Sequence, residues 1–509
     1  MTGESVGELV GTTGILGAPV FAAVDIGASS GRVILGKIKG VSDAGPAVDL
    51  RVVHRFPNGV VESDGGLRWD FDSLFAEVLN GLAAAAEAAT AAGEKIASIG
   101  IDTWAVDYGL VNASGELTAQ PFSYRDGRGG SAVERVHGVI DPERLYATTG
   151  LQFLPFNTVY QLATERDLNG VQPLLIPDLI AFFLTGQRRT EATNASTTGL
   201  FDAVAGEWAL EFFSALELHP DLFPPLVQPG ETVGTILPEI ALRTGLAPET
   251  TVVAVGSHDT ASAVAAVPAA TEDFAYISSG TWSLVGVELR HPVLTQASRE
   301  ANFTNERGVD GTIRYLRNVG GLWLLSECQR SWASGGVSGN GAVPDLPELL
   351  AAAAALPSGG PQVNADDPAF IAPDHMPERI RAAVRAAGGE LPSDPPAITR
   401  CIMDSLAAGY ARTIADAERL AGAAVDVVHI VGGGSQNRLL CQLTADATGK
   451  TVIAGPVEAT ALGNVLVQAR AAGQVAGGLR ELRSLIRPAE PVTLRPVSGA
   501  VPGIAALAD

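Results

Sequence analysis

A short apolar run that breaks at a Gly/Ser turn and then resumes occurs twice in this chain. Residues 21–35 carry the first copy, with its turn at residues 25–32, and residues 274–287 carry the second, with its turn at residues 278–281. Short apolar segments bounded by turn-forming residues predict a strand, a tight turn and a second strand. Because each half of the chain opens with this unit, we predict a duplicated domain whose copies face each other across a cleft that binds ligands.

The length of the chain agrees with two domains. A single hydrophobic core stops growing at about 250 to 300 residues, and this chain has 509. A strand at residues 251–255, a small-residue helix at 261–267 and Pro268 close the first half. We therefore expect a tail at residues 1–19, an N-terminal domain at 20–268, a C-terminal domain at 269–490 and a second tail at 491–509.

Helical and strand patterns alternate along both halves, which predicts an α/β architecture. The apolar spacing predicts helices at residues 74–92, 398–420 and 437–448, and strands at residues 96–101, 425–431 and 451–453. Residues 335–356 and 388–396 are rich in Gly, Ser, Ala or Pro, so we expect them to contain surface loops.

Charge and cysteine content exclude several classes of protein. The net charge of -22 and the absence of a Lys/Arg stripe argue against a nucleic-acid partner, and any phosphate site should be rich in glycine rather than lysine. Three widely spaced cysteines predict a reducing, cytoplasmic compartment. The first twenty residues lack the pattern of a signal peptide, and no run of 18 apolar residues predicts a membrane span.

Three turns have the composition of a phosphate site. At residues 25–32, backbone N–H groups and hydroxyls could surround phosphate oxygens while Asp25 orients a hydrated Mg²⁺; an ordinary hairpin turn is the alternative. The turn at residues 278–281 repeats the pattern. Gly432, Gly433 and Gly434 lie between a strand and a helix, which suits close approach of a nucleotide, although neither a Walker nor a dinucleotide-binding motif is present.

Two further segments place polar residues at the ends of strands. Asp102 and Trp104 follow a buried strand, where they could contact a ligand, or could cap a turn and fill the core. Asp107 is assigned to the hairpin that continues through residues 112–116. His258 and Asp259 follow the strand at 251–255, and Asp259 could accept a proton from a sugar hydroxyl or could be a helix N-cap, the commoner role for this spacing.

Eight segments together resemble the FGGY carbohydrate kinases, over nearly the whole chain from about residue 20 to about residue 472. They are residues 25–32, 101–104, 152–158, 257–263, 278–283, 321–325, 429–434 and 454–459. The resemblance implies the two-domain actin/hexokinase-like fold, with domains of RNase H-like topology that close over ATP·Mg²⁺ and a sugar in a central interdomain cleft.

The resemblance also implies roles for individual residues. Asp259 is expected to be the catalytic base, with Asp25 near the metal. The sugar contacts implied are Asp102, Trp104, Ala105, His258, Asp259 and Thr260, and the ATP contacts implied are Ala28, Ser29, Ser30, Gly31, Arg32, Thr281, Asn318 and Gly433. The partners expected are ATP and a small sugar, with the protein a monomer or a small homo-oligomer that binds neither nucleic acid nor membrane.

The activity expected from the resemblance is ATP-dependent phosphorylation of L-rhamnulose at its C1 hydroxyl. A kinase for another ketose, such as L-fuculose or a xylulose, is the first alternative, and an actin- or chaperone-like ATPase is the second. Two positions depart from the family pattern: Ala105 replaces a glycine, which adds a methyl group to the expected sugar pocket, and Ser326 replaces a glutamine, which removes a possible nucleotide contact.

Overall fold

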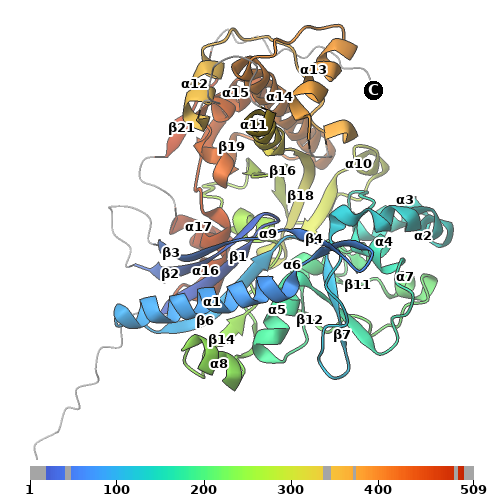
Figure 1. The fold of residues 1–509 in the computed structure, drawn as a ribbon, viewed down its shortest axis with the longest axis vertical. Coiled ribbons are helices and arrows are strands. Elements are labelled where there is room, and N and C mark those ends of the chain that lie inside the picture. The colour runs from blue at the N-terminus through green and yellow to red at the C-terminus, as the bar shows by residue number, and fades with distance from the viewer. Residues whose placement is uncertain (1–18, 40–47, 336–344, 371–373, 487–490, 498–509) are drawn as a thin grey trace, which may run out of the picture.

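Two β-sheets covered by helices organise the chain (Figure 1). The computed structural model describes residues 19–39, 48–335, 345–370, 374–486 and 491–497. The first sheet has the strand order β13-β14-β6-β1-β2-β3, with β1 (Val20–Ile26), β2 (Ser30–Ile38), β3 (Val48–Pro57), β6 (Ile96–Thr103), β13 (Thr232–Thr235) and β14 (Thr251–Val253). The second has the order β17-β18-β16-β15-β19-β20-β21, with β15 (Phe274–Ser279), β16 (Trp282–Leu289), β17 (Thr304–Arg307), β18 (Ile313–Gly320), β19 (Val427–Val431), β20 (Thr451–Ala454) and β21 (Val492–Leu494).

The same five-strand topology appears in both sheets. In the first, β1, β2 and β3 are antiparallel neighbours, while β6 and β14 continue from β1 in parallel. In the second, β15, β16 and β18 are antiparallel neighbours, while β19 and β20 continue from β15 in parallel. The duplication predicted from the two strand–turn–strand units is therefore confirmed at the level of sheet topology.

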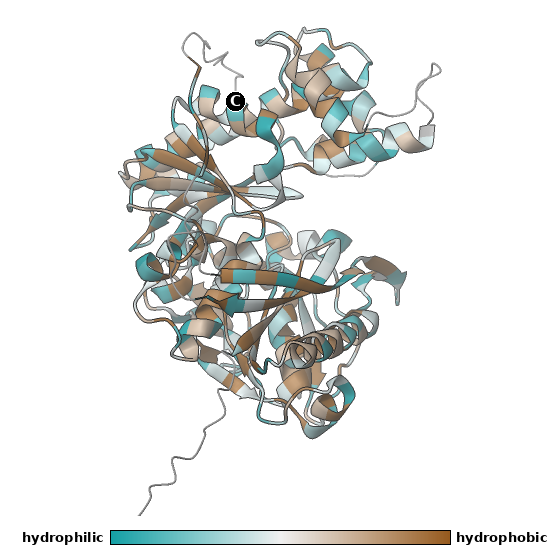
Figure 2. Ribbon diagram, turned by 90° about the vertical axis from the view of Figure 1, so that its left-hand side faces the viewer, coloured by the Kyte–Doolittle hydropathy of each residue, from teal (hydrophilic) through white to brown (hydrophobic). Residues whose placement is uncertain are grey.

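Burial explains why the first strand–turn–strand unit forms where it does. All seven residues of β1 are buried, as expected for a central strand covered on both faces, and Figure 2 shows hydrophobic residues along the strands of both sheets. In the turn, the Gly27 N–H donates to the Ser30 carbonyl at 2.9 Å, and the Asn58 side chain donates to the Gly27 carbonyl at 2.9 Å. A Cβ at Gly31 would lie 2.2 Å from the Phe56 ring, so this position admits glycine alone without rearrangement.

Helices cover the faces of the sheets, and smaller elements connect them. The helices are α1 (Phe71–Ala91), α2 (Val133–Val139), α3 (Pro142–Thr149), α4 (Thr158–Leu162), α5 (Ile176–Thr185), α6 (Ala192–Ala195), α7 (Leu210–Ala215), α8 (Pro238–Thr244), α9 (Asp259–Ala265), α10 (Gln296–Glu300), α11 (Trp323–Gly335), α12 (Leu346–Ala354), α13 (Met376–Ala386), α14 (Pro395–Ala421), α15 (Arg438–Thr448), α16 (Ala459–Ala471) and α17 (Leu479–Ser484). Short strands form small two-stranded sheets, namely β4 (Val60–Ser63), β5 (Gly66–Trp69), β7 (Tyr108–Asn112), β8 (Val171–Leu175), β9 (Thr190–Glu191), β10 (Phe201–Asp202), β11 (Glu207–Trp208) and β12 (Leu226–Val227). In the part of the chain that the structure describes, no helix is both long and apolar enough to cross a bilayer.

Most predicted elements are present with shifted ends. The strand predicted at residues 251–255 ends at Val253, and the segment expected to contain a loop at residues 335–356 includes helix α12, because its alanine-rich part packs against α14. Residues 336–344 of that segment lie outside the described residues, as do residues 1–18 and 498–509 of the predicted tails. The second expected loop, at residues 388–396, ends at Asp394, the N-cap of α14, so its last two residues are helical.

Helix α16 joins the two halves, because it follows β20 of the second sheet but packs on the first. Its Gln468 amide accepts a hydrogen bond from Ser98 Oγ on β6 at 2.7 Å and donates one to the Ala22 carbonyl on β1 at 3.1 Å. One hydrophobic cluster contains residues of β1, β15, α9 and α16. At Gly463, α16 approaches α9 so closely that a Cβ would lie 1.9 Å from the Ser262 carbonyl oxygen.

We predict that Gly463→Ala destabilises the protein, because the added methyl group forces α16 away from α9. A clash of this kind costs about 1 to 3 kcal/mol, which a lower Tm in a thermal unfolding experiment would report. The control is Gly138→Ala in α2, where a Cβ meets no atom within 4 Å and helix propensity predicts a stability gain of about 0.5 to 1 kcal/mol. An unchanged Tm for Gly463→Ala would contradict the close packing.

Candidate active site

Three carboxylates approach one another at the junction of the two sheets. Asp25 is the second-last residue of the buried strand β1, and its register partner on the parallel strand β6 is Asp102. Asp259 is the first residue of α9. The three are close enough that each of Asp25 and Asp102 has its pKa raised by the charge of Asp259, in addition to the effect of burial. The structure thus brings together three residues that lie far apart in the sequence.

The carboxylates of Asp25 and Asp102 have different hydrogen-bond and charge partners. Burial raises the pKa of Asp25, and this is opposed by Arg32, whose Nε and Nη2 donate to Asp25 Oδ2 at 3.0 and 2.8 Å. Burial, followed by the charge of Asp25, raises the pKa of Asp102 well above its usual range. Asn464 Nδ2 donates to Asp102 Oδ2 at 2.6 Å, but Asp102 Oδ1 is buried and has no hydrogen-bond partner among the described residues.

These two carboxylates fit a magnesium ion that is held mainly by other ligands. Mg²⁺ in nucleotide sites uses one or two carboxylates together with phosphate oxygens and water. Within the described ranges, no group of three or more His, Cys, Asp or Glu side chains could hold a metal by itself. A cation bound here would give a partner to Asp102 Oδ1, which has none among the described residues, and it would reduce the electrostatic repulsion between Asp25 and Asp102.

Asp259 does not cap its helix. The N-cap of α9 is His258, which makes no side-chain cap bond, and Asp259 follows it in the first turn. Its Oδ1 accepts a hydrogen bond from Thr260 Oγ1 at 3.0 Å and lies 3.5 Å from His258 Nε2. Since the side chain is 35% exposed, the carboxylate is accessible while one of its oxygens is held in place. The N-cap interpretation from the sequence is therefore wrong.

His258 is a buried member of a charged group rather than an isolated histidine. Its Nδ1 lies 3.0 Å from Glu306 Oε2 on β17, and Arg314 Nη1 on β18 lies 3.0 Å from the same oxygen. Arg314 is completely buried. Burial acts to raise the pKa of Glu306, but the charges of Arg314 and His258 outweigh it and hold that pKa below its ordinary value.

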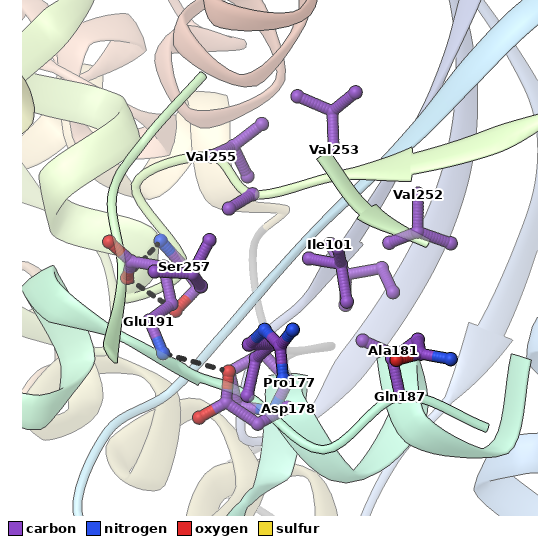
Figure 3. Close-up of a pocket in the computed structure, with 14 residues that line it drawn as sticks. Ile101, Pro177, Asp178, Ala181, Gln187, Glu191, Val252, Val253, Val255 and Ser257 are labelled. Atoms are coloured by element: carbon purple, nitrogen blue, oxygen red, sulfur yellow. Dashed lines mark hydrogen bonds between the residues drawn. The ribbon is translucent and has the colours of Figure 1, made fainter. Parts of the chain in front are cut away.

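The loop that carries His258 is held from behind by Glu191. Glu191 Oε2 accepts hydrogen bonds from the Ser257 N–H at 3.1 Å and from Ser257 Oγ at 2.7 Å, as the dashed lines in Figure 3 show. The cavity drawn there is about 20 Å³ in volume, and its lining is mainly apolar, with five polar or charged residues, Asp178, Gln187, Arg189, Glu191 and Ser257. That volume has room for roughly one water molecule, so the cavity is too small for a sugar. Glu191, in its lining, holds the loop in place.

The segment after β6 is more deeply buried than a ligand-stacking surface. The ring of Trp104 packs on Trp69 with centroids 4.2 Å apart, and only 7% of Trp104 is exposed. Asp107 accepts hydrogen bonds from the indole N–H groups of Trp69 at 2.7 Å and Trp104 at 3.0 Å, and from Gln161 Nε2 at 3.0 Å. Asp107 directly precedes β7, the first strand of the hairpin to which it was assigned, and its side chain organises the core beneath the site. Ala105 is half-buried, and its carbonyl accepts the Asp107 N–H at 2.9 Å.

The residues expected to contact ATP lie on turns of both sheets. Ala28, Ser29 and Ser30 form the β1–β2 turn, in which Ser29 and Ser30 are exposed. Gly31 is buried in β2, and Arg32 joins Asp25 to Glu458, whose Oε2 lies 2.5 Å from Arg32 Nη1. The loop that carries Glu458 also contacts the second glycine-rich turn. The Gly432 N–H donates to the carbonyl of Pro456, two residues before Glu458, at 3.1 Å.

The remaining expected ATP contacts surround the β15–β16 turn. A Cβ on Gly434 would lie 2.0 Å from Ser279 Oγ, whereas a Cβ on Gly433 would meet nothing within 4 Å, so Gly433 borders open space. Thr281 is half-buried, and its carbonyl accepts the Trp323 N–H at 3.1 Å. Asn318, on β18, donates from Nδ2 to Gln152 Oε1 in the first half at 3.1 Å. Ser326, one of the two departures, is exposed on α11.

Several residues of the site were missed by reasoning from the sequence. Asn464 and Gln468 are four residues apart in a part of α16, residues 461–469, that is otherwise apolar, and this polar pair on one helix face is a signal that could have marked a buried contact. Glu306 and Arg314 offer no comparable signal. They face each other only because β17 and β18 pair in the register that places these two residues opposite one another.

The comparisons with known proteins agree on one family. Residues 20–266 match the model of the FGGY family of carbohydrate kinases, N-terminal domain, and residues 275–472 match the model of its C-terminal domain. A rhamnulokinase of Bacteroides thetaiotaomicron is 41% identical over 473 residues, which cover 91% of this chain and 93% of the relative. A rhamnulokinase of Bacillus subtilis is 37% identical over 476 residues, which cover 93% and 94%.

Solved structures share the fold at low sequence identity. A gluconate kinase from Lactobacillus acidophilus superposes with a TM-score of 0.74 at 15% identity, covering 94% of each chain. A xylulose kinase from Rhodospirillum rubrum superposes with a TM-score of 0.72 at 18% identity, covering 94% of this chain and 95% of the other. The two-domain architecture of sugar kinases is thereby shown for this chain.

The buried Asp107 predicts a specific pH dependence of stability. Burial raises its pKa to about 6, so the folded protein retains a proton that the unfolded chain releases near pH 4. The stabilisation from this proton is complete below about pH 4 and is lost as the pH rises to about 6. In Asp107→Asn this titration is absent, so the free energy of unfolding of the variant minus that of the wild type should increase by on the order of 3 kcal/mol across this window.

Urea unfolding of both proteins at several pH values between about 4 and 7 measures this difference. The absolute stability of the variant falls for another reason, because an amide group presents an N–H donor to the Gln161 amide group. The test is therefore the slope and not the offset. Two stability curves that run parallel through the window would contradict the assignment.

Proposed function

Because the chain belongs to the FGGY family of carbohydrate kinases, we propose that it transfers the γ-phosphoryl group of ATP to the C1 hydroxyl of L-rhamnulose. The observation that carries the proposal is the state of Asp259, whose carboxylate is accessible and held at one oxygen, beside the Asp25 and Asp102 pair. The similarity to rhamnulokinases of 37% to 41% identity over nine-tenths of the chain supports L-rhamnulose over L-fuculose or a xylulose.

In the proposed reaction Asp259 is the general base. Its free Oδ2 accepts the proton of the C1 hydroxyl as that oxygen forms a bond to the γ-phosphorus of ATP. The bond between the γ-phosphorus and the bridging oxygen of the β-phosphate breaks, and the electron pair leaves with ADP. The products are L-rhamnulose 1-phosphate and ADP, and the proton taken by Asp259 passes to solvent after product release.

The residues around Asp259 are proposed to bind the sugar. His258 and Thr260 flank Asp259 in the sequence, and Thr260 Oγ1 donates to Asp259 Oδ1. The backbone at Ala105 and the carboxylate of Asp102, on β6, are proposed to complete the sugar site. Trp104 is proposed as a wall of the sugar site and not as an open stacking surface, since its ring is packed against Trp69. The methyl group of Ala105 narrows the proposed sugar site, compared with the glycine expected at this position.

ATP is proposed to lie between the two glycine-rich turns. Ala28, Ser29, Ser30, Gly31 and Arg32 would face it from the first sheet, and Thr281, Asn318 and Gly433 from the second. Asp25, with Asp102, would hold Mg²⁺, which when bound offsets the negative charge of the phosphates. With ATP as the donor, a cytoplasmic location belongs to the same proposal, and a monomer or small homo-oligomer stays a prediction.

We predict that Asp259→Asn loses about 100- to 10,000-fold in kcat, the usual contribution of a positioned base. Calorimetric titration should show that ATP and L-rhamnulose still bind, because the amide keeps the shape of the carboxylate. Asp221→Asn is the matched control, since the Asp221 side chain is 92% exposed and the variant should keep full activity. Asp259→Asn with wild-type kcat would remove Asp259 from the mechanism.

The position of the new phosphate ester is a separate prediction. Incubation with ATP, Mg²⁺ and L-rhamnulose should give one product, whose phosphorus couples to the C1 protons in a two-dimensional ³¹P–¹H NMR spectrum. Phosphorylation at another carbon would show that the sugar binds in a different orientation from the one proposed. Release of inorganic phosphate without a sugar phosphate would favour an ATPase over a kinase.

A further inference from the structure

The edge strand of the second sheet is docked on the first half of the molecule. β17 lies at the end of its sheet, next to β18. Along its other edge, the Asn305 N–H donates to the Gly150 carbonyl at 2.8 Å, and the Arg307 N–H donates to Ser196 Oγ at 2.8 Å. Since alternate residues of a strand face the same way, these two bonds define a continuous contact between the halves with Glu306 at its centre.

Glu306 stands between a cation of its own sheet and the loop that carries Asp259. Its register partner on β18 is Arg314, and the two side chains form an ion pair at 3.0 Å. His258 Nδ1 lies 3.0 Å from the same Oε2 and 3.2 Å from Arg314 Nη2, and the opposite ring nitrogen of His258 lies 3.5 Å from Asp259 Oδ1. Glu306 and Arg314 are 5% and 0% exposed, so water does not screen these charges.

The arrangement leaves Asp259 with its two oxygens in different states. Oδ1 is held by Thr260 Oγ1 and faces the His258 ring. Glu306 and its ion-pair partner Arg314 both contact the ring at Nδ1, so the position of Glu306 sets the tilt of the ring and the point at which Nε2 meets Asp259 Oδ1. A carboxylate that orients a histidine through one ring nitrogen, so that the other nitrogen meets the reacting group, is an established physical device.

We propose that Glu306 is a positioning residue that acts through His258 to orient the carboxylate of Asp259 toward the acceptor hydroxyl. The proposal rests on the proposed function, in which Asp259 is the base. Because Glu306 belongs to the second sheet and Asp259 to the first half, contact between the two halves then sets the geometry of the base. A structural role alone would stabilise β17 without any effect that depends on Asp259.

The test is a double-mutant cycle of Glu306→Gln and Asp259→Asn, which separates these two roles. Glu306→Gln should lower kcat by up to about 100-fold, the cost of a small displacement of a reacting group, while the KM values for sugar and ATP stay near those of the wild type. The double variant should be no slower than Asp259→Asn alone. Glu306→Asp, which keeps the charge, should recover part of the lost kcat.

Glu288→Gln is the matched control for the loss of a buried ion pair. Glu288 lies on β16, which is separated from β17 by β18, and it pairs with Arg483 at 2.8 Å; the two side chains are 11% and 7% exposed. This variant should lower the Tm by an amount similar to Glu306→Gln but keep the wild-type kcat. Multiplicative losses in the double variant, or an equal loss of kcat in Glu288→Gln, would overturn the proposal.

A structural readout decides the proposal independently of the identity of the sugar. Crystal structures of the wild type and of Glu306→Gln should differ in the side-chain orientation of His258 and Asp259, with β17 still docked. Identical orientations would overturn the proposal even if L-rhamnulose is the substrate. Inactivity of the wild type toward every ketose would refute the proposed function, while a reoriented Asp259 would still establish that Glu306 positions it.

Discussion

The close packing of α9 on α16 is the contact on which the rest of the structure depends. At Gly463 the two helices approach so closely that any side chain would meet the Ser262 backbone. α16 belongs to the second half by sequence and rests on β1 and β6 of the first half. Asn464 of the same helix donates to Asp102, and α9 begins with Asp259. The contact that joins the two halves therefore also places two carboxylates of the site.

Buried charge at this junction has a free-energy cost, which polar and charged partners offset. Burying an unpaired carboxylate is far more costly than burying an apolar group, and the site buries Asp25, Asp102 and Glu306. Arg32 compensates Asp25, Asn464 partly compensates Asp102, and Arg314 compensates Glu306. The remaining imbalance lies at Asp102, whose second oxygen has no partner among the described residues, which is where a cation and its nucleotide are proposed to act.

The sequence predicts the repeated part of the fold well and the contacts between the repeats poorly. The strand–turn–strand units, the helix that became α1 and the strand that delivers Asp102 are local patterns of apolar spacing and turn residues, and all are present. The side-chain contacts of Asp107 were not predicted because two of its partners, Trp69 and Gln161, come from distant segments. Glu306 and Arg314 could not be identified for the same reason, since cross-strand pairing on an edge strand depends on register, which the sequence of either strand does not specify.

The central claim is that the protein phosphorylates a specific ketose at this junction. A coupled assay of ADP release from ATP·Mg²⁺ tests it most directly. The acceptors compared are L-rhamnulose, L-fuculose, L-xylulose and D-xylulose, with ATP alone as the blank. The account predicts the highest kcat/KM for L-rhamnulose and only slow release without sugar, because closure over a bound sugar is what completes the catalytic arrangement. Release that no sugar stimulates would contradict the account, and a higher kcat/KM for another ketose would contradict the proposed substrate while leaving the kinase fold in place.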